Sequence, residues 1–269
     1  MSFIDHLEEL RWHFIRSLIV VSIVTIAAFF ATQIVFQQII LGPSRPDFVT
    51  YKFLCQMADW LNSPILCIGK LNFKLQSRLL SGQFMMHLTS SVIMGIVVSF
   101  PYIVWELWRF IKPGLYPKEQ RSARGVVFWV SLLFLLGIMF GYWVVAPLSI
   151  NFLASYQLSP DILNEFDIVS YVSTLITLVL ACGILFQLPV LVFFLASMGL
   201  ITPQLMITYR RHSIVIILII AAIITPPDIF SQILVAMPLQ VLYEISISIC
   251  RYVEKKQLKE AQISASSTQ

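Results

Sequence analysis

Residues 171–200 read YVSTLITLVLACGILFQLPVLVFFLASMGL, thirty consecutive positions without an Asp, Glu, Lys or Arg. An apolar run of about 20 residues already crosses the hydrocarbon core of a bilayer as one helix. This run is longer and carries Pro189 after Phe186, Gln187 and Leu188, so we expect a kink or a tilt at that point. The stretch therefore predicts a helical membrane protein.

Further apolar segments flank this one, and the stretches between them hold nearly all the charges. Of the 269 residues, 58% are apolar and 12% are charged. The six predicted spans cover residues 17–41, 83–105, 125–150, 171–200, 213–225 and 229–249. The fifth would be a helix of only about 20 Å against roughly 30 Å of hydrocarbon, so the bilayer thins there or neighbouring helices shelter it. We predict an all-α polytopic protein with one membrane domain, residues 1–253, and a disordered, solvated tail, residues 254–269.

Lys and Arg are distributed unevenly over the loops. Thirteen of the 18 lie before the first span, after the second and fourth spans, and after the sixth, whereas the first loop on the opposite side holds five. Positive loops stay in the cytoplasm, so we expect both termini there. The net charge of +4 reflects mostly this asymmetry and does not indicate nucleic-acid binding.

An acidic leader, residues 2–11 with the sequence SFIDHLEELR, precedes the first span. Its apolar and polar side chains fall on separate faces at helical spacing, which predicts an amphipathic entry helix. Two interpretations stay open. In the first, Glu8 pairs with Arg11 three residues on and Glu9 with His13 four residues on, and each pair stabilises the helix by a few tenths of a kcal/mol. In the second, the carboxylates bind a cationic partner from the cytoplasm.

A second cytoplasmic segment, residues 105–121, reads WELWRFIKPGLYPKEQR. Pro113, Gly114 and Pro117 predict a shaped turn with aromatic walls. Glu119 lies among five basic residues. It forms an internal salt bridge of little net energy, or it receives an incoming guanidinium through two parallel hydrogen bonds.

Polar residues within the spans are the remaining candidates, because polar groups are costly in lipid. Gln187 lies at membrane depth, where interhelical hydrogen bonding and a transport role are both open. The TPPD motif ends the fifth segment at Thr225, and Asp228 is expected to be the N-cap of the sixth helix. Gln232 and Glu244 follow in that helix.

The long external loop, residues 42–82, carries apolar patches that predict short helices lying over the membrane. Cys55 and Cys67 fall in this loop, on the side where disulfides form. A Cys55–Cys67 bond and two free thiols both remain open. No CxxC motif or His/Cys cluster indicates a metal site.

Several of these motifs together resemble the TatC family, the multispan receptor subunit of the twin-arginine protein translocase. They occur in the family's order from about residue 3 to residue 251 and are HLEELR (6–11), FIKPGLY (110–116) with EQR (119–121), FQLP (186–189), LITP (200–203) and TPPDIFSQ (225–232). The resemblance implies a cup- or glove-shaped bundle of six helices with short fifth and sixth helices. It also implies a bacterial inner-membrane receptor for signal peptides that carry two adjacent arginines.

Individual roles follow from the same resemblance. Glu9 and Glu119 are similar to the family's two arginine-binding acids, with Arg11 and Phe110 in the same surface. Thr225 and Gln232 lie where the family contacts its single-span partners TatB or TatA, and Pro43 resembles a family proline after the first span. Other copies of the chain, the lipid bilayer and export driven by the proton-motive force are further implications, and no cofactor is expected.

The chain departs from the family at Gln187, where many members carry a glutamate, so an ionisable group at that depth is in doubt. Rival classes fit less well. With four His residues and neither HExxH nor GxSxG, the chain does not indicate a hydrolase, and we expect it not to be an enzyme. A secondary transporter or channel is the alternative, but the chain lacks repeated halves and the polar groups expected at membrane depth are mostly neutral.

Overall fold

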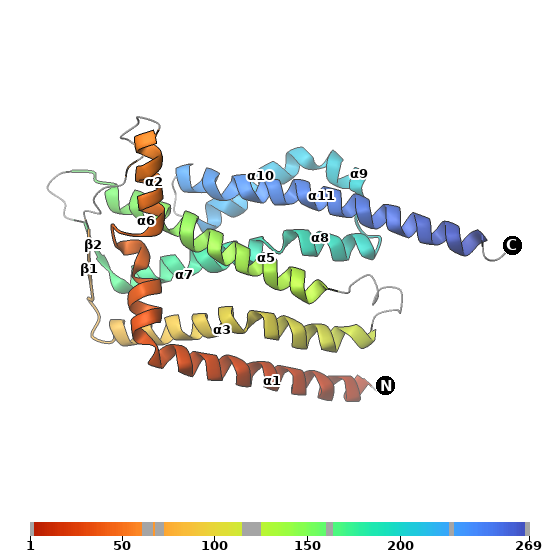
Figure 1. Ribbon diagram of the computed structural model, residues 1–269, viewed down its shortest axis with the longest axis horizontal. Coiled ribbons are helices and arrows are strands. Elements are labelled where there is room, and N and C mark those ends of the chain that lie inside the picture. The colour runs from red at the N-terminus through yellow and green to blue at the C-terminus, as the bar shows by residue number, and fades with distance from the viewer. Residues whose placement is uncertain are drawn as a thin grey trace.

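The computed structural model describes residues 3–60, 67, 73–114, 125–159, 164–225 and 229–266. Long helices lie side by side along the longest axis, and both ends of the chain lie at the same end of the bundle (Figure 1). Among the described residues, five helical stretches are long and apolar enough to cross a membrane: Glu8–Phe30, Gly82–Ile111, Val126–Ser155, Ile168–Ser197 and Ser231–Lys259. The all-α membrane architecture predicted from the sequence is confirmed.

The elements follow the predicted order with some changes of boundary. The helices are α1 (Phe3–Phe30), α2 (Val49–Trp60), α3 (Gly82–Ile111), α5 (Val126–Phe140), α6 (Ala146–Ser155), α7 (Ile168–Leu185), α8 (Leu188–Ser197), α9 (Pro203–Thr208), α10 (Arg210–Ile224) and α11 (Ile229–Ser266). Two π-helical segments, η1 (Gln33–Ile40) and η5 (Gly141–Val145), and two 3-10 turns, η2 (Gly42–Ser44) and η4 (Lys112–Gly114), complete the helical elements of the described residues. α10 has 15 residues, about 22 Å of helix, and packs against α11, which fits the expectation of a short, sheltered fifth helix.

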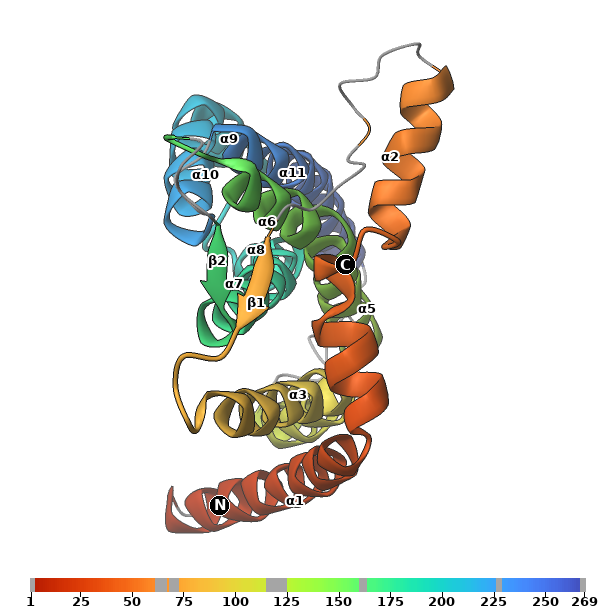
Figure 2. The ribbon, with the colours of Figure 1, turned by 90° about the vertical axis from the view of Figure 1, so that its left-hand side faces the viewer.

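The predicted first span, residues 17–41, is not one straight helix. α1 ends at Phe30, and the chain turns into η1, which crosses one end of the bundle (Figure 2). At the turn, Thr32 Oγ donates to the Phe29 carbonyl, and His87 Nε2 lies 3.1 Å from the same oxygen. These side-chain contacts satisfy a backbone group where the helical geometry changes, which an apolar pattern does not reveal.

Two expectations about the C-terminus are wrong. The sixth helix is not short, and residues 254–266 are not disordered, because α11 runs for 38 residues from Ile229 to Ser266. The segment after Val253 is rich in Glu, Lys, Gln, Leu and Ala, which are strong helix formers. A helix already started in the membrane extends through such a sequence without a new nucleation cost.

Small residues set the closest contacts between helices, as in many membrane bundles. A Cβ added at Gly95 of α3 would lie 2.1 Å from Thr25 Oγ1 of α1. A Cβ added at Gly137 of α5 would lie 2.6 Å from the Cys182 carbonyl oxygen of α7. Glycine at these two positions therefore permits the helix backbones to approach.

A two-stranded parallel ribbon lies at the end of the bundle opposite the termini (Figure 2). β1 (Lys74–Gln76) pairs with β2 (Glu165–Asp167), with Leu75 opposite Phe166. Asp167 caps α7 by accepting a hydrogen bond from the Val169 amide. The ribbon joins the loop before α3 to the loop before α7.

α2 forms a short helix in the first loop, as predicted, and the apolar residues that follow it, 61–66, lie outside the described residues. Tyr51 is buried, and its hydroxyl donates to the carbonyls of Pro43 (2.9 Å) and Pro147 (3.0 Å). Burial raises the pKa of Tyr51 above its ordinary value, so the phenol stays protonated and remains a donor. The buried Pro43 thus has a structural contact in this cap.

Cys55 in α2 is bonded to Cys67 as a disulfide, whereas Cys182 and Cys250 are free and buried. Of the two alternatives left open by the sequence, the structure shows the Cys55–Cys67 disulfide and not two free thiols. Replacing Cys55 and Cys67 by serine should destabilise this loop by up to about 3 kcal/mol, because a closed loop of about this length restricts the unfolded chain. We expect faster cleavage near residues 49–67 in limited proteolysis, with the bundle intact.

The matched control for the disulfide variant is Cys250→Ser, which leaves the bond in place. The wild type and Cys250→Ser should both change mobility on reduction in a denaturing gel, and the double variant should not. A wild-type protein isolated from membranes whose mobility is the same with and without reductant would contradict the pairing.

Candidate functional site

The acidic leader is continuous with the first span, because α1 begins at Phe3 and runs to Phe30 without a break. Glu9 is partly buried, whereas Glu8 and Arg11 are exposed. The Arg11 guanidinium carbon lies 5.7 Å from the centre of the Trp12 ring, a cation–π contact. Arg11 therefore has an aromatic neighbour on its own helix.

A buried pair joins α1 to α3 one turn further along the chain. His13 and Glu106 are 8% and 1% exposed, and His13 Nδ1 hydrogen-bonds Glu106 Oε2. Glu106 Oε1 accepts a second hydrogen bond from the Tyr102 hydroxyl at 3.0 Å. Both carboxylate oxygens thus have a partner, which is what a carboxylate at this depth requires.

This pair is absent from the sequence-based expectations, which set His13 against Glu9 on its own helix. The signal available was a carboxylate flanked by Trp105 and Trp108 at the end of an apolar span, where a charge is costly unless it is paired. The partner lies 93 positions away in the chain, so spacing alone does not identify it.

Phe110 follows Glu106 by one turn of α3, and its ring centre lies 6.1 Å from that of His13. Glu9 precedes His13 by one turn of α1. Since α1 and α3 run in opposite directions, Glu9 and Phe110 both lie on the side of the pair toward the chain termini (Figure 1). The structure therefore places two of the predicted site residues at one end of the α1–α3 pair, while Glu119 lies outside the described residues.

The kink predicted near Pro189 is confirmed, because α7 ends at Leu185 and α8 begins at Leu188 with proline in its first turn. Gln187 lies between the two helices, and its Nε2 donates to the Val130 carbonyl of α5 at 3.0 Å. Its Oε1 is buried without a hydrogen-bond partner among the described residues. Of the two uses considered for Gln187, the structure shows interhelical hydrogen bonding.

The α10–α11 hairpin holds the other polar candidates. Thr225 is buried and donates to the Ala221 carbonyl at 2.8 Å, which closes the end of α10. Gln232 Nε2 donates to the Leu218 carbonyl at 3.1 Å and so links α11 to α10. Asp228, expected as an N-cap, lies outside the described residues.

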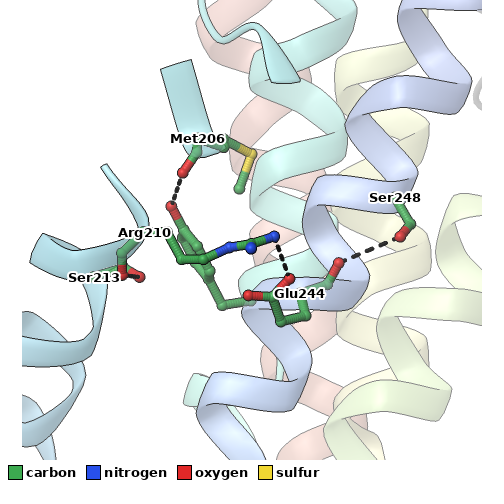
Figure 3. Close-up of polar contacts among 6 residues, drawn as sticks. Met206, Arg210, Ser213, Glu244 and Ser248 are labelled. Atoms are coloured by element: carbon green, nitrogen blue, oxygen red, sulfur yellow. Dashed lines mark hydrogen bonds and ion pairs between the residues drawn. The ribbon is translucent and has the colours of Figure 1, made fainter. Parts of the chain in front are cut away.

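Glu244 of α11 forms an ion pair. Its carboxylate pairs with the Arg210 guanidinium of α10 at 2.8 Å, and both side chains are roughly half-exposed (Figure 3). The Tyr243 hydroxyl donates to the Met206 carbonyl at 2.9 Å and adds a contact between α11 and α9. Across the described part of the chain, no three His, Cys, Asp or Glu side chains gather as a metal site.

Comparison with known proteins adds to this geometry. The family model described as "Sec-independent protein translocase protein (TatC)" matches residues 5–238. A TatC protein of Blattabacterium sp. subsp. Periplaneta americana is 38% identical over 258 residues, which cover 95% of this chain and 97% of the relative. One of Koribacter versatilis is 37% identical over 262 residues, 95% and 87% of the two chains. A crystal structure of the twin arginine translocase receptor TatC superimposes with a TM-score of 0.64 at 31% identity, over 93% of this chain and 99% of that one.

Proposed function

The chain belongs to the TatC family of Sec-independent protein translocase proteins, and we propose that it is the membrane receptor for twin-arginine signal peptides of folded proteins. The observation that carries this proposal is the likeness to a solved twin arginine translocase receptor over nearly the whole chain. The end of the α1–α3 pair supports it, because Glu9 and Phe110 lie there on two helices held together by His13 and Glu106. The same family membership favours a translocase component over a small-solute transporter or channel.

Recognition is proposed to use two carboxylates, Glu9 and Glu119, one for each arginine. A guanidinium offers parallel N–H donors that match both oxygens of a carboxylate, whereas a lysine ammonium is a point charge without this geometry. Arg11 and Phe110 would line the same surface. The two parallel hydrogen bonds between each guanidinium and its carboxylate therefore favour arginine over lysine.

The proposed site faces the cytoplasm. Both chain ends lie at the end of the bundle that carries Glu9, and the Lys- and Arg-rich segments belong to that end by the distribution of charge along the sequence. In this orientation, α2 and the β ribbon lie on the external side of the inner membrane. A cytoplasmic site is where the signal peptide of a folded cargo would first arrive.

Partner binding is proposed for the α10–α11 hairpin. Thr225 and Gln232 lie near the end of that hairpin away from the termini, where single-span TatA- or TatB-type helices would pack in the membrane. Assembly with other copies of the chain and transport driven by the proton-motive force complete the proposal.

The test is photocrosslinking of a twin-arginine signal peptide that carries a photoreactive residue beside the arginine pair, with the chain in membranes. Loss of a hydrogen-bonded charge partner costs about 1.5–3 kcal/mol, so Glu9→Ala and Glu119→Ala should each lower peptide affinity by about ten- to a hundredfold. Glu8→Ala is the matched control, one position from Glu9 and exposed, and should crosslink like the wild type.

A peptide with two lysines in place of the arginines should crosslink poorly to the wild type. Crosslinking that is undiminished in both the Glu9 and Glu119 variants, or absent from the wild type, would contradict this site.

A further inference from the structure

α2 carries an apolar stripe that nothing in the described chain covers. The four side chains recur at intervals of four, four and three residues and are exposed to 67%, 58%, 38% and 83%: Val49, Phe53, Met57 and Trp60. At 100° per residue they fall within an arc of about 80°. Tyr51 and Ala58, on the opposite side of the helix, are buried against the rest of the protein.

The contacts of α2 indicate its depth relative to the membrane. Thr50 Oγ1 donates to the Trp143 carbonyl, and Tyr51 donates to the Pro147 carbonyl at 3.0 Å. Trp143 lies in the membrane-spanning stretch Val126–Ser155, about 26 Å of helix from Val126 at 1.5 Å per residue. A hydrocarbon core about 30 Å thick that begins at Val126 ends near Trp143, so this count places the start of α2 near the boundary away from the termini.

The direction of α2 also fits this boundary. It runs crosswise to the spans at one end of the bundle (Figure 1), so it lies parallel to the membrane plane, and it projects outward beside α6 (Figure 2). Its exposed polar residues fall on a separate arc and are Lys52, Gln56 and Asp59. Separate apolar and polar faces on a helix parallel to the membrane are typical of interfacial helices.

We propose that α2 is an interfacial anchor whose stripe of Val49, Phe53, Met57 and Trp60 inserts between phospholipids of the leaflet opposite the termini. Lipid is the proposed occupant because α2 contacts the Val126–Ser155 span near the boundary of the hydrocarbon core. Trp60 suits this position, because indole rings gather at the membrane interface. The Cys55–Cys67 bond ties the middle of α2 to the returning chain, so the stripe keeps its direction.

Photocrosslinking to lipid tests this in the full-length protein, reconstituted into phosphatidylethanolamine–phosphatidylglycerol vesicles. Benzoylphenylalanine replaces Phe53 or, as the matched control, Lys52, which is the adjacent residue about 100° around the same helix. Both positions are exposed, and retention of the disulfide, seen as a mobility change on reduction, verifies that each variant has folded. The pair Trp60 and Asp59 repeats the comparison at the end of the helix.

We expect several-fold more phospholipid adduct, measured by mass spectrometry, at positions 53 and 60 than at positions 52 and 59. Equal lipid adduct at the paired positions would overturn the proposal. Adduct from position 53 mainly to a second copy of the chain, or to another membrane protein when native membranes are used, would assign the stripe to a protein interface and would overturn it as well.

Discussion

Replacing Glu106 by alanine is expected to lower the free energy of unfolding by about 3–5 kcal/mol, the usual effect of removing one partner of a buried pair. The His13 imidazole and the Tyr102 hydroxyl would both lose the group that they contact, in a site where Glu106 is 1% exposed. The same contact joins α1 to α3, so its loss also removes one of the contacts that hold the helix carrying Glu9. Chemical denaturation of the purified protein in detergent, followed by tryptophan fluorescence, measures the change.

Glu106→Gln is the control for this prediction, because an amide oxygen still accepts a hydrogen bond and the volume is kept. We expect it to cost only about 1 kcal/mol. A double-mutant cycle with His13→Ala should show a strong coupling between the two positions. Additive effects of His13→Ala and Glu106→Ala would contradict the pairing seen in the structure.

Gly137→Val is expected to prevent accumulation of the folded protein in membranes. A Cβ at Gly137 would lie 2.6 Å from the Cys182 carbonyl oxygen, 2.8 Å from Gly183 Cα and 2.9 Å from Phe186 Cβ. Two of these atoms belong to the backbone of α7 and cannot rotate away as a side chain end can. α5 and α7 would therefore have to separate, at a cost above the roughly 1–3 kcal/mol of ordinary overpacking.

The matched control for this prediction is Leu136→Val, one position away on the same helix and exposed. It should accumulate and unfold like the wild type, whereas Gly137→Ala should fall between the two. Membrane fractionation with immunoblotting gives the amounts, and a thermal unfolding curve gives the stability. Normal accumulation and stability of Gly137→Val would show that α5 and α7 are not packed as closely as described.

The architecture could be predicted from the sequence because lipid imposes a simple rule, a long apolar run for each crossing. Pro189 predicted the kink next to Gln187. The short apolar run at residues 213–225 predicted the short fifth helix. The turn after Phe30 could not be predicted in this way, because residues 31–40 carry no charge and no Pro or Gly that would mark a turn, and a contact that holds it comes from His87 on another helix. The tail was predicted to be disordered because it is charged and polar, yet its residues favour helix and α11 extends to Ser266.

The candidate site was predictable only in part. Motif resemblance suggested Glu9, Phe110 and Glu119, and the structure places the first two at one end of α1 and α3. Glu119 in this role stays a prediction. The His13–Glu106 contact was missed because it depends on two helices meeting in space, and the sequence shows only which side chains lie on one helix.

The β ribbon has a consequence for biosynthesis. β1 ends at Gln76, but its partner strand begins only at Glu165, after α3 and the whole Val126–Ser155 stretch have been made. At about 5–20 residues per second, a ribosome needs on the order of ten seconds to synthesise the intervening chain. During that interval β1 has no partner strand, so oxidation of Cys55 and Cys67 can precede strand pairing.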